Sequence, residues 1–316
     1  VSMREMGLFV SGGGHTCPVK TALSNAAPVI NSTNANVTVP ISTPFALTAN
    51  ATDADGDELT YLWEQMNNEA STQPPVATAT GGPNFRSFDP SLSPTRYFPN
   101  LTALSTGGPY TWEVLPSVSR TMNFRVSVHD NHSVASCNDY MDVTVATDAT
   151  AGPFVLDYPT ATGITWAATS NQTVLWDVAN TNNANVNCQF VDLYLSTDGG
   201  QTYPTLLASN VANNGSFEIS VPNTPTTTAR VMVMSDAGTF FDISNNNFEI
   251  TGVSDTYQLT VVEDVMSVCS EDDAIYEIEI LQIGAYTDPV TLSVSGLPGG
   301  ATSSFSVNPT STPEFR

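Results

Sequence analysis

Three aspartates at alternate positions are the residues of this chain whose spacing best suits a chemical role. Asp53, Asp55 and Asp57 surround Gly56, and residues 59–64 then place Leu, Tyr and Trp on one face of an extended chain. This period of two predicts a half-buried strand that begins directly after an acidic loop. Carboxylate oxygens are the ligands that calcium prefers. We therefore predict an interstrand calcium loop, with a metal-free Asp-Gly turn as the alternative.

An EF-hand is the first alternative form of calcium site to consider. Glu64 follows Asp53 by eleven residues, as the last ligand of an EF-hand loop does, but the sixth position of that loop is Glu58. An EF-hand requires glycine at that position, and the alternating residues that follow predict a strand instead of a helix. The EF-hand is therefore rejected.

A fourth carboxylate comes from a distant part of the chain. Asp130 ends a predicted strand over residues 123–130, and such a residue supplies what a calcium cage needs beyond its first loop. The predicted metal ligands are thus Asp53, Asp55, Asp57 and Asp130. An Asx turn at Asp130 is the alternative.

Other site chemistries find less support in the sequence. The three histidines, at positions 15, 129 and 132, belong to no His-Glu-x-x-His motif, so we expect no zinc. Paired carboxylates catalyse glycoside hydrolysis, but acidic residues are too abundant here to single out a pair. No nucleophile elbow, P-loop or dinucleotide fingerprint is present. We predict no catalytic and no cofactor-binding residue.

Composition limits the partners. The 316 residues include 8 Lys and Arg against 31 Asp and Glu, a formal net charge of −23, which disfavours nucleic acid and anionic membranes. No apolar run reaches the roughly 18 residues of a spanning helix, so we expect no membrane insertion. The first ten residues contain Glu5 and lack an apolar core, so we expect no signal peptide there. Because the chain begins with Val1, we expect a fragment or processed product. Four scattered cysteines (17, 137, 188, 269) argue against a zinc cluster and leave disulfide pairing open.

Short strands separated by Gly, Pro and Asn turns predict an all-β chain of tandem Ig-like or fibronectin-III-like β-sandwiches. Residues 1–24 are expected to be a short helix and the trailing segment of an upstream domain. Residues 25–147 form a first, cadherin-like sandwich with a long irregular insertion at 67–119, and residues 148–251 form a second. Residues 252–316 are too few for a sandwich of about 100 residues, so we expect an incomplete third module.

Two details concern turns and aromatic residues. The turn Asp198-Gly199-Gly200 matches an Asp-box hairpin, which we interpret as a folding device. Strands are also predicted at 257–262, 276–283 and 290–294. Three tryptophans are expected in cores (63, 166, 176), whereas Trp112 in the long insertion is expected to be exposed.

Several patches carry a family resemblance, among them Trp63-Glu64-Gln65, Arg96-Tyr97-Phe98-Pro99 and Trp176-Asp177-Val178. With them, nearly the whole chain resembles the region after the catalytic domain in secreted reprolysin-like zinc metallopeptidases of gliding and marine bacteria. The resemblance implies that residues 1–10 end that catalytic domain and that Cys17 matches a cysteine following it. The zinc motif is absent, so no catalytic residue is implied. The acidic loop and Asp130 also resemble calcium loops of cadherin-like and polycystic-kidney-disease-type domains.

We therefore expect a calcium-stabilised, non-catalytic accessory region of a secreted or cell-surface metallopeptidase. Its expected partners are the upstream catalytic domain and a protein substrate or the cell surface. A fragment of a bacterial surface adhesin, with sandwiches as spacers, is the alternative. An enzyme in its own right would instead need a pocket with a carboxylate of raised pKa.

Overall fold

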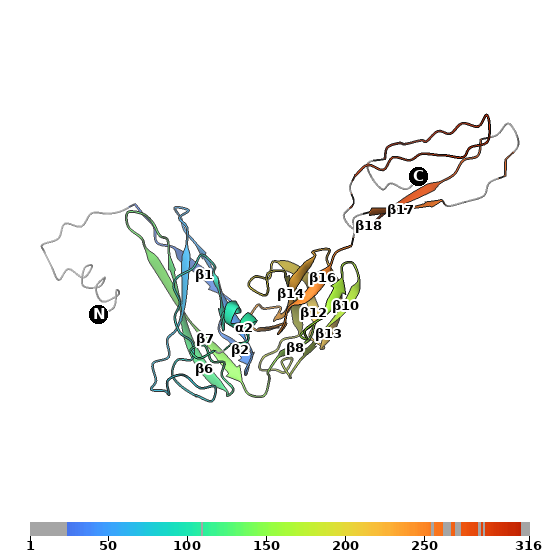
Figure 1. Cartoon of the computed structure of the whole chain (residues 1–316). Coiled ribbons are helices and arrows are strands. Elements are labelled where there is room, and N and C mark those ends of the chain that lie inside the picture. Colours follow the sequence, from blue (N-terminus) through green and yellow to red (C-terminus); the bar gives the residue numbers. More distant parts are fainter. Residues whose placement is uncertain are drawn as a thin grey trace.

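The computed structural model describes residues 24–108, 110–253, 256–261, 267–268, 273–283, 286 and 288–310. Its regular elements are strands with one short helix, so the predicted all-β class is confirmed (Figure 1). The expected N-terminal helix, His15, Cys17 and Cys269 lie outside the described residues. Among the described residues, no helix has the length and hydropathy needed to span a membrane.

The first sandwich consists of two sheets, drawn in blue to green in Figure 1. The sheet of order β1-β3-β5 contains β1 (Val29–Thr33), β3 (Phe45–Thr52) and β5 (Thr95–Phe98). The sheet of order β2-β7-β6-β4 contains β2 (Val37–Pro40), β7 (Asn138–Asp148), β6 (Arg120–His129) and β4 (Thr60–Gln65). All pairs are antiparallel except β2 and β7, which run parallel.

Aromatic side chains join the two sheets of this sandwich. Phe45 on β3 stacks on Phe98 of β5 with ring centroids 4.8 Å apart. Phe124, from β6 in the opposite sheet, meets these rings edge-on at 5.9 and 5.0 Å. Trp63 is buried, as predicted, and its indole N–H donates to the carbonyl of Pro94. Burial of such rings is the main source of stability in a core of this kind.

The expectation that residues 67–119 are irregular throughout is wrong. They contain β5 and the helix α2 (Leu101–Thr106). Asn100 caps α2, because its side-chain oxygen accepts the N–H of Ala103, and Gly107 ends it in the left-handed conformation at φ 75°. Trp112 is exposed, as expected.

The second sandwich follows in green to orange (Figure 1). One sheet has the order β13-β10-β8, with β13 (Ser216–Ser220), β10 (Asn171–Asp177) and β8 (Val155–Tyr158). The other has the order β12-β11-β14-β16-β9, with β12 (Thr205–Ala212), β11 (Phe190–Ser196), β14 (Thr226–Ser235), β16 (Phe248–Thr251) and β9 (Thr165–Ala167). β15 (Phe241–Ile243) also pairs with β14.

The predicted core tryptophans and hairpin turn are found in this sandwich. Trp166 and Trp176 are buried. Asp198 fixes the turn between β11 and β12, since its carboxylate accepts the Gln201 N–H and both the N–H and hydroxyl of Thr202. Gly200 has a φ of +87°, and a Cβ there would lie 3.0 Å from the Tyr203 hydroxyl, so the turn requires glycine.

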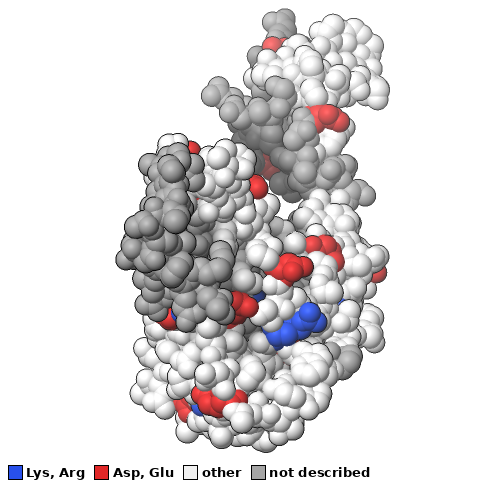
Figure 2. Space-filling model, turned by 90° about the vertical axis from the view of Figure 1, so that its left-hand side faces the viewer, with Lys and Arg blue, Asp and Glu red and all other residues white. Residues whose placement is uncertain are grey.

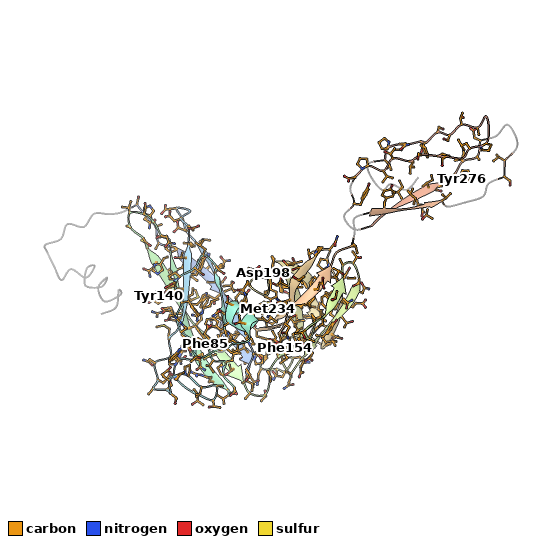
Figure 3. The ribbon with its side chains drawn as sticks, viewed as in Figure 1. Phe85, Tyr140, Phe154, Asp198, Met234 and Tyr276 are labelled. Carbon is orange, nitrogen blue, oxygen red and sulfur yellow. The ribbon has the colours of Figure 1, made fainter. Side chains whose placement is uncertain are left out.

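The two sandwiches are in direct contact, and backbone hydrogen bonds cross between them. The Ala46 N–H donates to the Thr239 carbonyl at 2.9 Å, and the Phe241 N–H donates to the Pro44 carbonyl at 3.0 Å. Ala46 packs in an apolar cluster with Met232, Phe241 and Ile243 of the second sandwich. Met234, a partly buried neighbour of this cluster, is labelled in Figure 3. The start of β3 thus continues the hydrogen bonding of the β14–β15 ribbon.

The remaining described strands are β17 (Thr256–Val261) and β18 (Ile278–Ile283), an antiparallel pair drawn in red in Figure 1. The strand expected at 290–294 is wrong, because Val290 makes a single isolated bridge to Thr310.

Candidate metal site

Three chain segments meet at the acidic loop of the first sandwich: residues 25–26 ahead of β1, the loop 53–58 between β3 and β4, and residues 130–137 between β6 and β7. The Ala26 N–H donates to the Asp55 carboxylate at 2.7 Å. The Asn131 side-chain amide donates to the Glu58 carbonyl at 3.0 Å. These contacts fasten the loop to segments 29 and 73 residues away in sequence.

The loop itself brings its three aspartates together. One carboxylate oxygen from each of Asp53, Asp55 and Asp57 lies within 4.8 Å of the others. The Oδ1 of Asp53 accepts the N–H groups of Asp55 and Asp57 at 2.9 and 3.1 Å, which curls the backbone around that carboxylate. Gly56, with φ +80°, supplies the left-handed residue that this curl needs.

Oxygen atoms of the loop and of the segment ahead of β1 are buried without hydrogen-bond partners. These atoms are Oδ2 of Asp53, Oδ2 of Asp57 and Oδ1 of Asn25. Buried acceptors of this kind cost free energy unless a donor or a cation satisfies them. Three hard oxygen atoms without partners fit calcium, which takes about 6–8 oxygen ligands.

Asp130 is placed differently from the three loop aspartates. It is 1% exposed, and its oxygens accept hydrogen bonds from the Asn25 side-chain amide and from the N–H groups of His132 and Cys137. Burial acts to raise the pKa of Asp130, but these hydrogen bonds and one from Ser136 outweigh it and lower the pKa to about 2. Asp130 is not one of the three grouped carboxylates. Instead it holds Asn25 at 2.7 Å.

Asn25 is the residue that sequence reasoning missed. Its Nδ2 donates to Asp130 and to the Ala135 carbonyl, and this leaves its Oδ1 without a partner. The signal in the sequence is slight: an asparagine just ahead of a proline and the first strand. Its partner Asp130 lies 105 residues away, so local patterns do not reveal the pairing.

Three other residues considered in the sequence are His132, Cys137 and Cys188. His132 accepts N–H groups from Val134 and Ala135 through Nδ1. Cys137 is partly exposed and Cys188 is buried, and both are free thiols. Acidic side chains are spread over the face seen in Figure 2, without a single acidic patch that would mark a site there.

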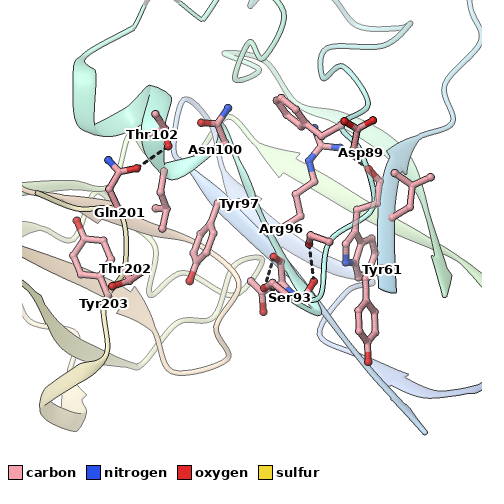
Figure 4. A pocket seen from close by; sticks show the side chains of 16 residues that line it. Tyr61, Asp89, Ser93, Arg96, Tyr97, Asn100, Thr102, Gln201, Thr202 and Tyr203 are labelled. Carbon is pink, nitrogen blue, oxygen red and sulfur yellow. Dashed lines mark hydrogen bonds between the residues drawn. The ribbon is translucent and has the colours of Figure 1, made fainter. Parts of the chain in front are cut away.

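A groove lies where the two sandwiches meet, with a volume of about 520 Å³. Its walls come from β4, the 88–95 segment, β5 and the start of α2 on one side, and from residues 201–203 of the second sandwich on the other (Figure 4). Gln201 closes one end, since its side chain accepts the Thr102 hydroxyl at 2.7 Å and donates to Ser105 at 2.8 Å.

No family model and no curated relative matches the chain. Among solved structures it is similar to the fibronectin(III)-like modules of Clostridium thermocellum CbhA, with 9% identity over 71% of this chain and 92% of that chain at a TM-score of 0.23. It is also similar to the FN1–FN3 domains of chicken CNTN1, with 10% identity over 72% of this chain and 67% of that chain at a TM-score of 0.24. A third is the insect immune protein hemolin, with 6% identity over 74% and 49% at a TM-score of 0.21. The sheet order of the chain itself shows the β-sandwich fold.

Proposed function

We propose that this chain is a non-catalytic structural and binding region of tandem β-sandwiches, and that calcium stabilises the first sandwich. The observation that carries the calcium proposal is the set of buried oxygens without partners on Asp53, Asp57 and Asn25. The proposed ligands are these residues and Asp55, whose oxygen lies in the same group of carboxylates.

A bound cation would offset two unfavourable features of this arrangement, the repulsion among the carboxylates and the burial of oxygens without partners. It neutralises three carboxylates whose oxygens lie within 4.8 Å of one another, and it satisfies oxygens that water does not reach. Asp130 acts one step back, because its carboxylate accepts the Asn25 amide hydrogen and so turns Oδ1 away from itself. Groups that orient a ligand in this way contribute to metal affinity without touching the metal.

Calcium at this position would join the segment entering β1 to the loop between β3 and β4. The chain already has one such link, from the Ala26 N–H to Asp55. A ligand of the folded state alone stabilises it by mass action, about 2.7 kcal/mol at a concentration 100 times its Kd. The predicted role is therefore stabilisation and ordering, with no bond-breaking step.

The wider setting that we propose is the accessory region of a secreted bacterial metallopeptidase of the reprolysin-like kind, outside the cell. The likeness of the Trp63–Gln65 and Arg96–Pro99 patches to such proteins supports it. Its partners would be the upstream catalytic domain and a protein substrate or the cell surface. A spacer of a surface adhesin is the second candidate, favoured by the hydrogen bonds that cross between the sandwiches. A His-Glu-x-x-His segment in the upstream reading frame supports the first, and its absence there supports the second.

Thermal unfolding tests the calcium proposal. We expect the Tm of the chain to rise with millimolar calcium and to fall with EGTA, and we expect Asp57→Asn to remove this difference. Glu58→Gln is the matched control, because it deletes a charge from an exposed residue of the same loop and should leave the difference intact. Equal Tm values in calcium and EGTA for the parent chain would contradict the proposal.

A further inference from the structure

The groove between the sandwiches contains polar groups that the protein itself does not use. The hydroxyls of Tyr61 and Tyr97 and the carboxylate of Asp89 line it, and within the described part of the chain none of them has a hydrogen-bond partner. The Arg96 Nε–H, also in the lining, is buried without a partner. The two hydroxyls and the carboxylate can therefore bond to a ligand without first breaking an internal contact.

The lining is charge-balanced in a chain of net charge −23. Arg96 and Asp89 are its charged residues. Arg96 is also paired with Glu113 at 3.3 Å, and its guanidinium lies over the rings of Phe88 and Phe98. A strongly anionic ligand would be repelled by the protein as a whole, and a cationic one would meet Arg96.

Aromatic rings supply the apolar part of the groove. Figure 4 shows Tyr97 between the 201–203 segment on one side and Arg96 with Ser93 on the other, and Tyr61 at the far end. Phe88, which is 38% exposed, adds a third ring. Tyrosine presents an apolar face and a polar tip, which suits a ligand that has both kinds of surface.

We propose that this groove binds a short, uncharged oligosaccharide. Sugar rings offer flat C–H faces to Tyr61, Tyr97 and Phe88, and their hydroxyls can donate to the Asp89 carboxylate and accept from the two tyrosine hydroxyls. The volume of about 520 Å³ falls within the usual 300–1,000 Å³ of small-molecule sites. The inference goes beyond the calcium proposal and does not depend on it.

The groove is also held in shape before any ligand arrives. Gln201 links the second sandwich to α2 of the first through Thr102 and Ser105. Asp198 fixes the same loop by four hydrogen bonds, from Ser196, Gln201 and Thr202. A preformed site loses less entropy on binding than one that must order itself.

Affinity electrophoresis tests the proposal, with gels that contain a soluble neutral β-glucan, xylan or galactomannan. We expect at least one of these polysaccharides to retard the parent chain. Asp89→Ala and Tyr61→Phe should weaken that retardation about tenfold and a few-fold respectively, since each removes hydrogen bonds to the sugar. Both changes remove groups without internal partners, so the fold is expected to persist, and the Tm verifies it.

Tyr140→Phe is the matched control, because Tyr140 is an exposed tyrosine on β7 outside the groove (Figure 3). It should bind as the parent does. Gels that contain a basic peptide such as oligolysine are run beside the polysaccharide gels. The proposal would be overturned if none of the three polysaccharides retards the parent, if Asp89→Ala and Tyr61→Phe bind as the parent does, or if only the basic peptide is bound.

Discussion

Asp242 should make the stability of the second sandwich depend on pH in an unusual direction. It lies on β15 between Phe241 and Ile243, two residues of the apolar cluster at the junction. Its Oδ2 accepts the Leu156 N–H from β8 at 2.7 Å. Burial raises the pKa of Asp242 to about 7, against lowering by backbone hydrogen bonds from Leu156 and Ile243 and with a further rise from the nearby charge of Asp157.

The sign and size of the effect follow from proton linkage. The ordinary pKa is 3.8, so the folded chain binds a proton that the unfolded chain has released between about pH 4 and 7. The stabilisation contributed by Asp242 is therefore fully present below about pH 4 and is lost progressively as the pH rises to about 7. A rise of about three pKa units corresponds to a loss of at most about 4 kcal/mol.

Asp242→Asn removes this titration and keeps a side-chain carbonyl that can accept the Leu156 N–H. Urea unfolding of the parent and the variant at pH 4.5, 6, 7 and 8 measures the difference. We expect the variant to gain on the parent by a few kcal/mol between pH 4.5 and 8. Glu249→Gln, an exposed carboxylate on β16, should run parallel to the parent. Parallel curves for Asp242→Asn would refute the reasoning.

Two further predictions concern buried groups. Arg120 donates to three oxygens of the 79–84 segment, so Arg120→Leu should lower the free energy of unfolding, measured in urea, by about 3 kcal/mol. Arg125→Leu breaks an exposed ion pair and should lower it by less than about 1 kcal/mol. Equal losses for the two variants would contradict this. Burial raises the pKa of the Cys188 thiol to about 12. We therefore expect iodoacetamide at pH 8 to alkylate the partly exposed Cys137 of the native protein and not Cys188, as measured by mass spectrometry. Rapid labelling of both cysteines would contradict this.

The sequence predicted the strands that bury every second side chain. Residues 123–130 and 191–195 alternate clearly. All of them except Asp130 lie within β6 and β11, strands of ten and seven residues, because β6 ends at His129. The period-two pattern is a direct consequence of strand geometry, so it survives without knowledge of the partners. Strands of three or four residues such as β5 and β9 carry too few alternations to be recognised.

The helix α2 had a signal that could have been used. Asn100 precedes six helix-compatible residues and Gly107 follows them, which is a cap at each end of a single turn or two. The Pro- and Gly-rich surroundings favoured a loop instead. The contact of α2 with the second sandwich through Gln201 depends on residues about 100 positions apart, and no local pattern predicts it.

The candidate metal site likewise has one part that local sequence predicts and one part that it does not. The grouping of Asp53, Asp55 and Asp57 is local, because three alternate residues around a glycine curl onto one another. The arrangement of Asn25 and Asp130 is not local, because a hydrogen bond across 105 residues fixes the Asn25 amide, whose Oδ1 has no partner. The sequence predicted Asp130 beside the acidic loop, but it gave no sign that the oxygens of Asp130 are taken by hydrogen bonds from Asn25, His132 and Cys137.

Isothermal titration calorimetry with calcium tests the central claim most directly. The parent chain, freed of metal with chelator, is expected to bind calcium at a site that Asp53→Ala and Asn25→Ala weaken and that Glu58→Gln leaves unchanged. For Asp53→Ala, the number of calcium ions bound per chain should fall by about one. A parent and an Asp53→Ala variant with the same heat and stoichiometry would contradict the account, as would a parent that takes up no calcium.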